Sequence, residues 1–351
     1  MREYLLTLVI AAALTYMLTP LIRNLALRNK AVAHVRDRDI HTETTPRWGG
    51  VAMWVSMAIT LVMVNSLELV GKAYSRELLG IFLAATFVLF LGMLDDRFEL
   101  DAVTKLAGQG LAAGILLLFG IQILWLPIDG IQLLTVLVVI VIINAVNFVD
   151  GLDGLAAGIV AISAASFFGF SYLLAVENGF SRAGAPSLVT AIVIGTCLGF
   201  LPHNIHPARI FMGDSGSMFL GLVLAAAAIT LMGQIDANAV FSENIGPAAL
   251  PLLLPFAVLA IPLFDFLSAV FRRIRRGRSP FAPDKEHLHH KLMSWGNTQE
   301  RTSVILYFLT ATLALPAMLS AFIPLWGAII VGCVLLFLTA LLTNRKTKVG
   351  I

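Results

Sequence analysis

Carboxylate and amide side chains recur in short polar stretches of this otherwise apolar chain. The first stretch is the pair Asp95 and Asp96, directly after the apolar run 87–94. Two adjacent carboxylates at the end of such a run repel each other, so a divalent cation or a cationic substrate group would stabilise them. One of the two could instead hold a raised pKa and act as a base. For the pair taken alone, the favoured alternative is that both residues cap the next helix.

The second stretch contains two asparagines and two aspartates. Asn144 and Asn147 lie three residues apart and share a helix face, and Asp150 and Asp153 follow, each before a glycine. Oxygen ligands beside glycine turns suit Mg²⁺ and phosphate, whereas the carboxylate spacing of a calcium-binding EF-hand is missing. The alternative is a tight turn between two helices with capping carboxylates.

The third stretch reads Gly-Asp-Ser-Gly-Ser over residues 213–217, ahead of an apolar run. Asp214 and Ser215 therefore lie where a helix is expected to begin. Free backbone N–H groups at such an end bind anions, and a carboxylate beside them could reach a phosphate through Mg²⁺. A plain N-cap explains the same residues equally well.

The fourth stretch is the basic segment 271–301, which contains His287, His289 and His290. Imidazole and guanidinium groups together suit a pyrophosphate. Zinc fits less well, because no cysteine is near in the sequence and no His-Glu-x-x-His pattern occurs. A basic run beside an apolar segment is also an ordinary topology signal and a contact for lipid headgroups.

The elements that must position these residues are membrane-spanning helices. Of 351 residues, 58% are hydrophobic and only 13% are charged, and the mean hydropathy is +0.89. So few charges cannot cover the surface of a soluble protein of this size. Two cysteines exclude a disulfide-built secreted domain, and a net charge of +3 gives no reason to expect nucleic acid as a partner. The chain is predicted to be an all-α, polytopic integral membrane protein with a single transmembrane catalytic domain over 1–351.

Eleven apolar runs are long enough to span a membrane as helices. They lie near 4–22, 48–66, 78–94, 103–119, 131–148, 154–176, 187–203, 216–233, 247–270, 302–322 and 324–343. With the N-terminus outside and the C-terminus in the cytoplasm, 20 of the 24 Lys and Arg residues are cytoplasmic, which sets the orientation. The cytoplasmic loops 23–47, 95–105, 147–153, 203–215 and 271–301 then form one active-site face that holds all four polar stretches.

Together these motifs resemble the polyprenyl-phosphate N-acetylhexosamine-1-phosphate transferases, the superfamily that includes the WecA/TagO-like branch and the peptidoglycan enzyme MraY. The resemblance extends from Thr-Pro-Arg-Trp-Gly-Gly at 45–50 to His290, with the four other motifs in the family's order. It implies transfer of a sugar-1-phosphate from a UDP-sugar to polyprenyl phosphate, with release of UMP. It further implies a Mg²⁺ requirement, with Mn²⁺ as an alternative ion, and a bacterial inner membrane location.

The resemblance also implies roles for individual residues. Asn147 and Asp214 would be metal ligands or lie close to them, and Asp95 would deprotonate or orient the lipid phosphate with Asp96 beside it. The remaining positions would hold the nucleotide and the phosphates of the substrates. They are Arg47, Lys105, Asn144, Asp150, Asp153, His287, His289 and His290.

Two departures from the peptidoglycan branch predict the donor sugar. That branch typically carries Lys where this chain has Glu99, and Thr where this chain has Arg47. Both differences favour UDP-GlcNAc as donor, with another UDP-N-acetylhexosamine as the alternative. The product would begin a cell-envelope glycopolymer. The length of the polyprenol and the oligomeric state stay open, with a homodimer as one alternative.

The alternative to a transferase is an ion-coupled transporter, which would place its ionisable residues near mid-membrane, in discontinuous helices. The membrane-embedded Asp265 either supports the site indirectly, by holding residues that contact the substrates, or only pairs with Arg272 or Arg273.

Overall fold

The computed structural model describes residues 1–32, 45–67, 75–123, 130–177, 184–233, 253–279 and 287–344. In these ranges the secondary structure is helical, apart from one isolated bridge between Val32 and Pro46. The helices are α1 (Arg2–Arg28), α2 (Gly49–Ser66), α3 (Arg76–Phe98), α4 (Ala102–Leu118), α5 (Ile131–Val149), α6 (Leu155–Tyr172) continued by a π-helical turn (Leu173–Glu177), α7 (Gly184–Asn204), α8 (Gly213–Met232), α11 (Ala260–Arg275), α12 (Leu288–Ser294), α13 (Gln299–Leu319) and α14 (Leu325–Asn344).

Nine of the described helices are long and apolar enough to cross a membrane, which confirms a polytopic helical membrane protein. They are α1, α2, α3, α5, α6 with its π-helical turn, α7, α8, α13 and α14. The shorter α4 coincides with the predicted span 103–119. For the predicted span 247–270, residues 247–252 lie outside the described part, and a helical segment 253–258 leads into α11. The number eleven stays a prediction.

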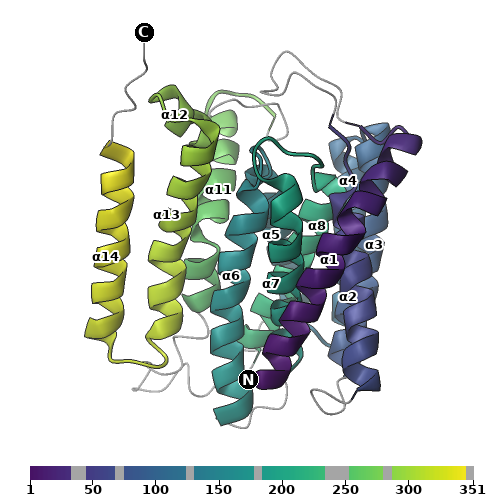
Figure 1. Ribbon diagram of the computed structural model, residues 1–351, viewed down its shortest axis with the longest axis horizontal. Coiled ribbons are helices and arrows are strands. Elements are labelled where there is room, and N and C mark those ends of the chain that lie inside the picture. Colours follow the sequence, from purple (N-terminus) through teal and green to yellow (C-terminus); the bar gives the residue numbers. More distant parts are fainter. Residues whose placement is uncertain are drawn as a thin grey trace.

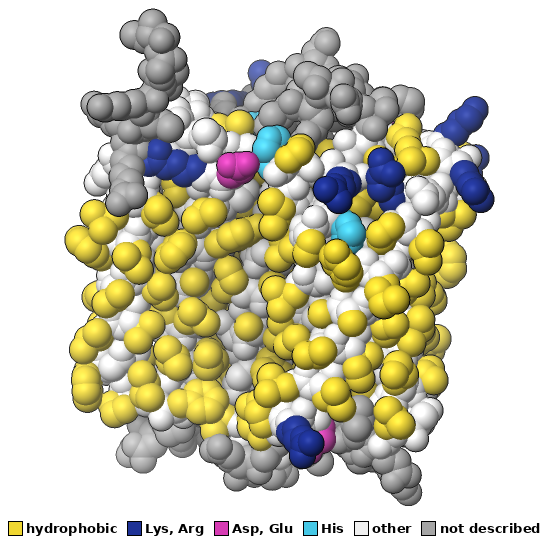
Figure 2. All heavy atoms as spheres, in the orientation of Figure 1, with side chains coloured by type: hydrophobic (Ala, Val, Ile, Leu, Met, Phe, Trp, Pro, Cys, Tyr) yellow, Lys and Arg dark blue, Asp and Glu magenta, His cyan; other side chains and the backbone are white. Residues whose placement is uncertain are grey.

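The helices lie side by side, with the N-terminus at the lower end of the bundle and the end of α14 at the upper end (Figure 1). On the face drawn in Figure 2, hydrophobic side chains form a continuous belt, and Lys and Arg side chains gather mainly above it. α3 and α5 finish at the upper end, α8 begins there, and α12 lies there (Figure 1). The polar stretches are therefore carried to one end of the bundle rather than to its middle, which does not match the placement expected for an ion-coupled transporter.

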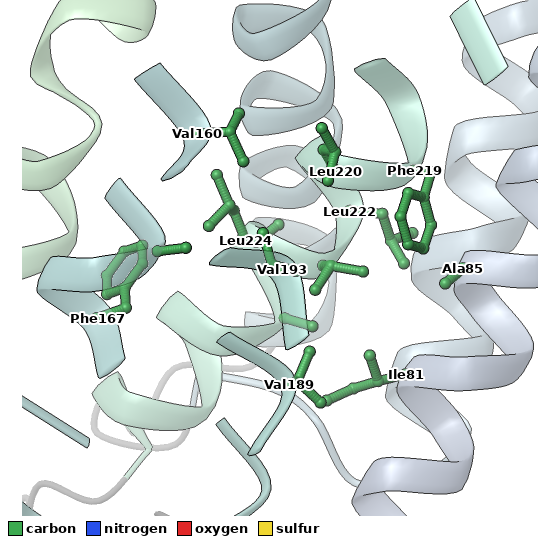
Figure 3. Close-up of a cluster of buried hydrophobic side chains, with 14 of the residues drawn as sticks. Ile81, Ala85, Val160, Phe167, Val189, Val193, Phe219, Leu220, Leu222 and Leu224 are labelled. Atoms are coloured by element: carbon green, nitrogen blue, oxygen red, sulfur yellow. The ribbon is translucent and has the colours of Figure 1, made fainter. Parts of the chain in front are cut away.

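α8 is the centre of the bundle, and its apolar stretch is buried along its whole length. Figure 3 shows side chains of α8, such as Phe219 and Leu224, among residues of α3, α6 and α7. A helix that is apolar on every side suits this central position, because all of its faces meet other helices. The outermost helix, α14, is mostly exposed on its apolar surface, as expected where lipid replaces protein contacts.

Glycines allow several helices to approach each other backbone to backbone. On α7, Gly195 and Gly199 are spaced by four residues and face α1: a Cβ at Gly199 would lie 2.2 Å from the carbonyl oxygen of Ala12. Near the upper end, a Cβ at Gly92 of α3 would lie 2.5 Å from the backbone of Ser215. Small residues in this spacing are typical of membrane helices that pack at short range.

The helix is interrupted at Leu259, between the segment 253–258 and α11. Pro262 has no N–H, so it cannot donate to the carbonyl group of Val258 four residues earlier. The hydroxyl group of Ser163 on α6 donates to that carbonyl oxygen instead, at 3.2 Å. The break is therefore stabilised by a neighbouring helix, as the absence of water inside a membrane requires.

Several helices extend beyond the predicted spans. α1 continues to Arg28 and α3 to Phe98, so that Asp95 and Asp96 lie on the last turn of α3 rather than in a loop. Charged residues can extend a helix past the hydrocarbon region, because their side chains reach the polar interface. The short helix α12, within the predicted loop 271–301, was not predicted either.

We expect Gly199→Ala to lower the free energy of unfolding by about 2 kcal/mol, because the added methyl group must push α1 away from α7. Gly114→Ala is the matched control, since nothing lies within 4 Å of a Cβ at Gly114 on α4. Thermal unfolding of both purified variants in the same detergent measures the difference. Equal melting temperatures would contradict the close contact between α1 and α7.

Candidate active site

Asp96 connects the last turn of α3 to the first turn of α8. Its two carboxylate oxygens accept hydrogen bonds from the backbone N–H groups of Asp214 at 2.9 Å and Ser215 at 3.1 Å. Residue 213 has a positive φ of 70°, and a Cβ there would lie 2.5 Å from Asp96 Oδ2, so both its conformation and its space require glycine. The anion at this helix end is thus a carboxylate of the chain itself, and the alternative in which Asp214 and Ser215 form the plain N-cap is wrong.

Asp95 has different partners from Asp96. Its Oδ1 accepts from the backbone N–H of Leu100 at 2.8 Å, and its Oδ2 forms an ion pair with Lys105 of α4. The side chain of Asp101 caps α4 by accepting from the backbone N–H groups of Val103 and Thr104, each at 3.0 Å. The alternative in which Asp95 and Asp96 cap the next helix is therefore wrong.

Asp214 lies between a lysine and an asparagine. Its Oδ2 is 3.1 Å from the Lys105 ammonium group, and its Oδ1 accepts from Asn147 Nδ2 at 2.8 Å. Asn147 Nδ2 also donates to the hydroxyl group of Ser217 at 2.8 Å. Lys105 thus joins Asp95 to Asp214, and residues of α3, α4, α5 and α8 meet in one cluster. We call Asp95, Lys105, Asn147 and Asp214 the central cluster.

Asn144 lies one helical turn below Asn147 and has other neighbours. Its Nδ2 donates to Gln109 Oε1 at 2.6 Å and to the carbonyl oxygen of Ile140 at 2.8 Å. Gln109 and Lys105 are four residues apart on α4, so one face of this helix carries the partner of Asn144 and the partner of Asp214. Gln109 was not predicted as a site residue, although a polar pair at this spacing in an apolar helix is a signal that the sequence contains. A role of Asn144 in substrate binding stays a prediction.

Backbone hydrogen bonds fix the segment that carries Arg47. The Phe211 N–H donates to the Pro46 carbonyl oxygen at 2.9 Å, and the Gly49 N–H donates to the Phe211 carbonyl oxygen at 3.0 Å. Arg47 is therefore held beside the chain that leads into Asp214. Its guanidinium charge lowers the pKa of Asp150, but burial and the charges of Asp214 and other carboxylates outweigh it and raise that pKa to about 8.

Asp153 is buried and organises the chain ahead of α8. Its Oδ2 accepts from His206 Nδ1 at 2.8 Å and from the Ala208 N–H at 3.0 Å. The next residue, Gly154, accepts a hydrogen bond from the Tyr307 hydroxyl group at 2.6 Å. The turn after Asp150 thus holds both the 206–208 segment and α13, contacts that the sequence did not predict. A direct role of Asp153 in holding the nucleotide stays a prediction.

The three histidines gather beside this turn. The rings of His289 and His290 have centroids 4.3 Å apart, and a Cβ at Gly151 would lie 2.6 Å from the His289 ring. Burial, followed by the neighbouring histidines, lowers the pKa of His289 to about 3, so this ring is neutral near pH 7. His287 donates from Nδ1 to Asp265 Oδ2 at 3.2 Å, which agrees with a supporting role for Asp265.

The donor atoms of the central cluster suit a hard cation. Within the described ranges, no group of three or more His, Cys, Asp or Glu side chains is arranged to hold a metal ion. Zinc sites typically need such a group, whereas Mg²⁺ is commonly held by one or two carboxylates together with substrate phosphates. The carboxylate of Asp214 fits the second arrangement. Asn147 turns its Nδ2 toward Asp214, so its amide oxygen would have to rotate toward an ion in order to bind it.

Comparison with known proteins gives a consistent relationship. The model of glycosyl transferase family 4 matches residues 78–232, which include the whole central cluster. The decaprenyl-phosphate N-acetylglucosaminephosphotransferase of Mycolicibacterium smegmatis is 40% identical over 90% of this chain and 82% of its own length. The probable undecaprenyl-phosphate N-acetylglucosaminyl 1-phosphate transferase of Bacillus subtilis is 28% identical over 99% of this chain and 95% of its own. In Escherichia coli K12, the undecaprenyl-phosphate alpha-N-acetylglucosaminyl 1-phosphate transferase is 28% identical over 89% of this chain and 83% of its own. With 40% identity over nine tenths of its length, the chain belongs to glycosyl transferase family 4.

Proposed function

We propose that this protein transfers GlcNAc-1-phosphate from UDP-GlcNAc to polyprenyl phosphate, giving polyprenyl-diphosphate-GlcNAc and UMP. The observation that carries this proposal is the central cluster, in which two carboxylates, an amide and a lysine converge at one end of a membrane bundle. A water-soluble nucleotide and a lipid phosphate can meet only at such an end. The reactions named for the relatives support the same chemistry.

The reaction is a direct displacement at phosphorus. An oxygen of the lipid phosphate forms a new bond to the sugar-bearing phosphorus of UDP-GlcNAc, and the bond from that phosphorus to the bridging oxygen breaks. UMP leaves with the bridging oxygen. Such transfers depend mainly on positioning and on stabilisation of charge, so the protein needs to supply little covalent chemistry.

The residues divide these tasks by position. Asp95 orients the acceptor phosphate or takes its remaining proton, and Lys105 places positive charge where the two substrates meet. Asp214 and Asn147 would hold Mg²⁺, with Mn²⁺ as an alternative ion, and the ion would supply charge neutralisation on the diphosphate. Arg47 and the histidines contact the phosphates, and Asp150 and Asp153 contact the nucleotide.

The setting of the reaction is part of the proposal. The site faces the cytoplasm of a bacterial cell, at the inner membrane, where UDP-sugars are available. The product is then the first lipid-linked intermediate of a cell-envelope glycopolymer. The gathering of Lys and Arg at the upper end of the bundle supports this orientation, because cytoplasmic ends are enriched in these residues.

The orientation can be tested by labelling two serine-to-cysteine variants in whole cells, in a background without Cys197 and Cys333. Ser294 ends α12 at the upper end, and Ser320 follows α13 at the lower end. A membrane-impermeant thiol reagent should label Ser320→Cys in intact cells and Ser294→Cys only after permeabilisation. The reverse pattern would overturn the orientation and the cytoplasmic placement of the site.

Donor choice is tested with purified protein and a short polyprenyl phosphate. Because Glu99 and Arg47 replace the residues typical of the peptidoglycan branch, UDP-GlcNAc should be turned over and UDP-N-acetylmuramoyl-pentapeptide should not. UMP release measures both rates. Comparable turnover of the two donors would contradict the assignment of the donor while leaving phosphotransfer itself intact.

The roles of Asp214 and Asp95 are separated by their asparagine variants. Asp214→Asn should weaken Mg²⁺-dependent binding of UDP-GlcNAc, because an amide is a poorer ligand than a carboxylate. Asp95→Asn keeps an oxygen for the Leu100 N–H, so nucleotide affinity should survive while turnover falls by about 10²–10⁴-fold if a general base is lost.

Calorimetric titration of UDP-GlcNAc with and without Mg²⁺ measures the affinities of both variants. Glu300→Gln serves as the control, because Glu300 is an exposed carboxylate at the same end of the bundle, in the first turn of α13. Turnover of Asp95→Asn should recover partly at higher pH if Asp95 is a base and not if it only orients the acceptor. An equal loss of Mg²⁺-dependent binding in both aspartate variants would show that Asp95 is itself a metal ligand.

A further inference from the structure

Asp265 is a buried carboxylate on α11 that does not belong to the central cluster. Only 5% of its surface is exposed, and both of its oxygens have partners at the start of α12. Oδ1 accepts from the Leu288 N–H at 2.9 Å, and Oδ2 accepts from His287 Nδ1 at 3.2 Å. His287 occupies the N-cap position of α12 without capping the helix through its own side chain. Asp265 therefore supplies the cap and holds the imidazole at the same time.

This contact selects one form of the His287 ring. An ionised carboxylate only accepts hydrogen bonds, so the hydrogen must be on Nδ1, and Nε2 is the ring nitrogen left for another partner. The plane of the ring is fixed as well. Its centroid lies 5.2 Å from that of Phe148 in an edge-to-face contact, and 5.7 Å from that of His289 with the two planes 4° apart.

The stacked rings of His287 and His289 also contact the turn after α5, whose residue Asp150 the proposed function assigns to the nucleotide. His289 is stacked on His287 and touches Gly151, the residue after Asp150. Gly151 follows the end of α5, the helix whose last turns carry Asn147. α11 therefore contacts the turn beside the central cluster indirectly. Asp265 binds His287, His287 stacks on His289, and His289 contacts Gly151.

We propose that Asp265 is a positioning residue that presents Nε2 of His287 to the diphosphate of the nucleotide-sugar donor. This inference rests on the proposed function and assigns a role to a residue outside the central cluster. The donor diphosphate is favoured over the acceptor phosphate, because the histidines dock on the Asp150–Gly151 turn, whereas Lys105 and Asp95 meet on the side of α3 and α4.

The test is a double-mutant cycle with Asp265→Asn, His287→Gln and the double variant, all in the full-length protein. Asparagine keeps an oxygen acceptor for the Leu288 N–H but can also present an N–H group toward His287. The hydrogen of the His287 ring is then no longer held on Nδ1. Each single variant should raise KM for UDP-GlcNAc by about 10-fold to 100-fold, by analogy with the loss of a partner that orients a metal-ligating histidine. The double variant should be no worse than His287→Gln alone, and KM for polyprenyl phosphate should change less than twofold.

Three further variants separate positioning from folding. Gly151→Ala should also raise KM for UDP-GlcNAc, because the methyl group would displace His289 without touching Asp265, whereas Gly114→Ala should not. Glu300→Gln controls for loss of one carboxylate at this end of the bundle. If Asp265→Asn does not fold, as judged by its melting temperature, Gly151→Ala still tests the inference.

Each outcome decides between the proposals. Additive effects of Asp265→Asn and His287→Gln would overturn the inference, and so would an unchanged KM in Gly151→Ala. A rise in KM for polyprenyl phosphate instead would assign the histidine to the acceptor and overturn the choice of ligand. If the wild-type protein does not turn over UDP-GlcNAc at all, the proposed function fails, and this inference fails with it.

Discussion

The arrangement of the site depends on one carboxylate buried against the start of one helix. Asp96 binds the first free N–H groups of α8, and α8 is the helix around which the others pack. Inside a membrane, a helix end without partners is costly, because no bulk water replaces them. The contact therefore gives hydrogen-bond acceptors to two backbone N–H groups of α8, and it also fixes the register of α8 against α3. That register places Asp214 opposite Lys105 and Asn147.

Crowded carboxylates give the site its electrostatic character. Asp95 and Asp214 share one lysine, and the charges of Asp214, Asp96 and Asp153 add to burial in raising the pKa of Asp150. Such a cluster binds cations readily, since an added positive charge relieves repulsion between groups that cannot move apart. Lys105 provides part of that charge in the described structure. The Asn147 amide group holds Asp214 in place without adding further charge, and the Ser217 hydroxyl group in turn holds that amide.

The sequence predicted the helices and the residue types of the site better than the contacts. Spans follow from runs of apolar residues, and polar residues inside such chains are rare enough to mark a site. Partners are harder to predict, because α8 is apolar on all sides and has no periodicity that shows which face meets which helix. Asp95 and Asp96 were thus predicted as a pair, whereas each binds a different helix. The contact of Gln109 with Asn144 depends on the packing of α4 against α5, which no local pattern reveals.

The distance along the chain between Asp265 and its partners has a consequence for biosynthesis. The central cluster is complete once α8 has been made, but His287 is translated 22 residues after Asp265. Until then the buried carboxylate lacks both of the partners that the finished protein gives it. The nascent chain therefore acquires all four residues of the central cluster before it acquires the three histidines.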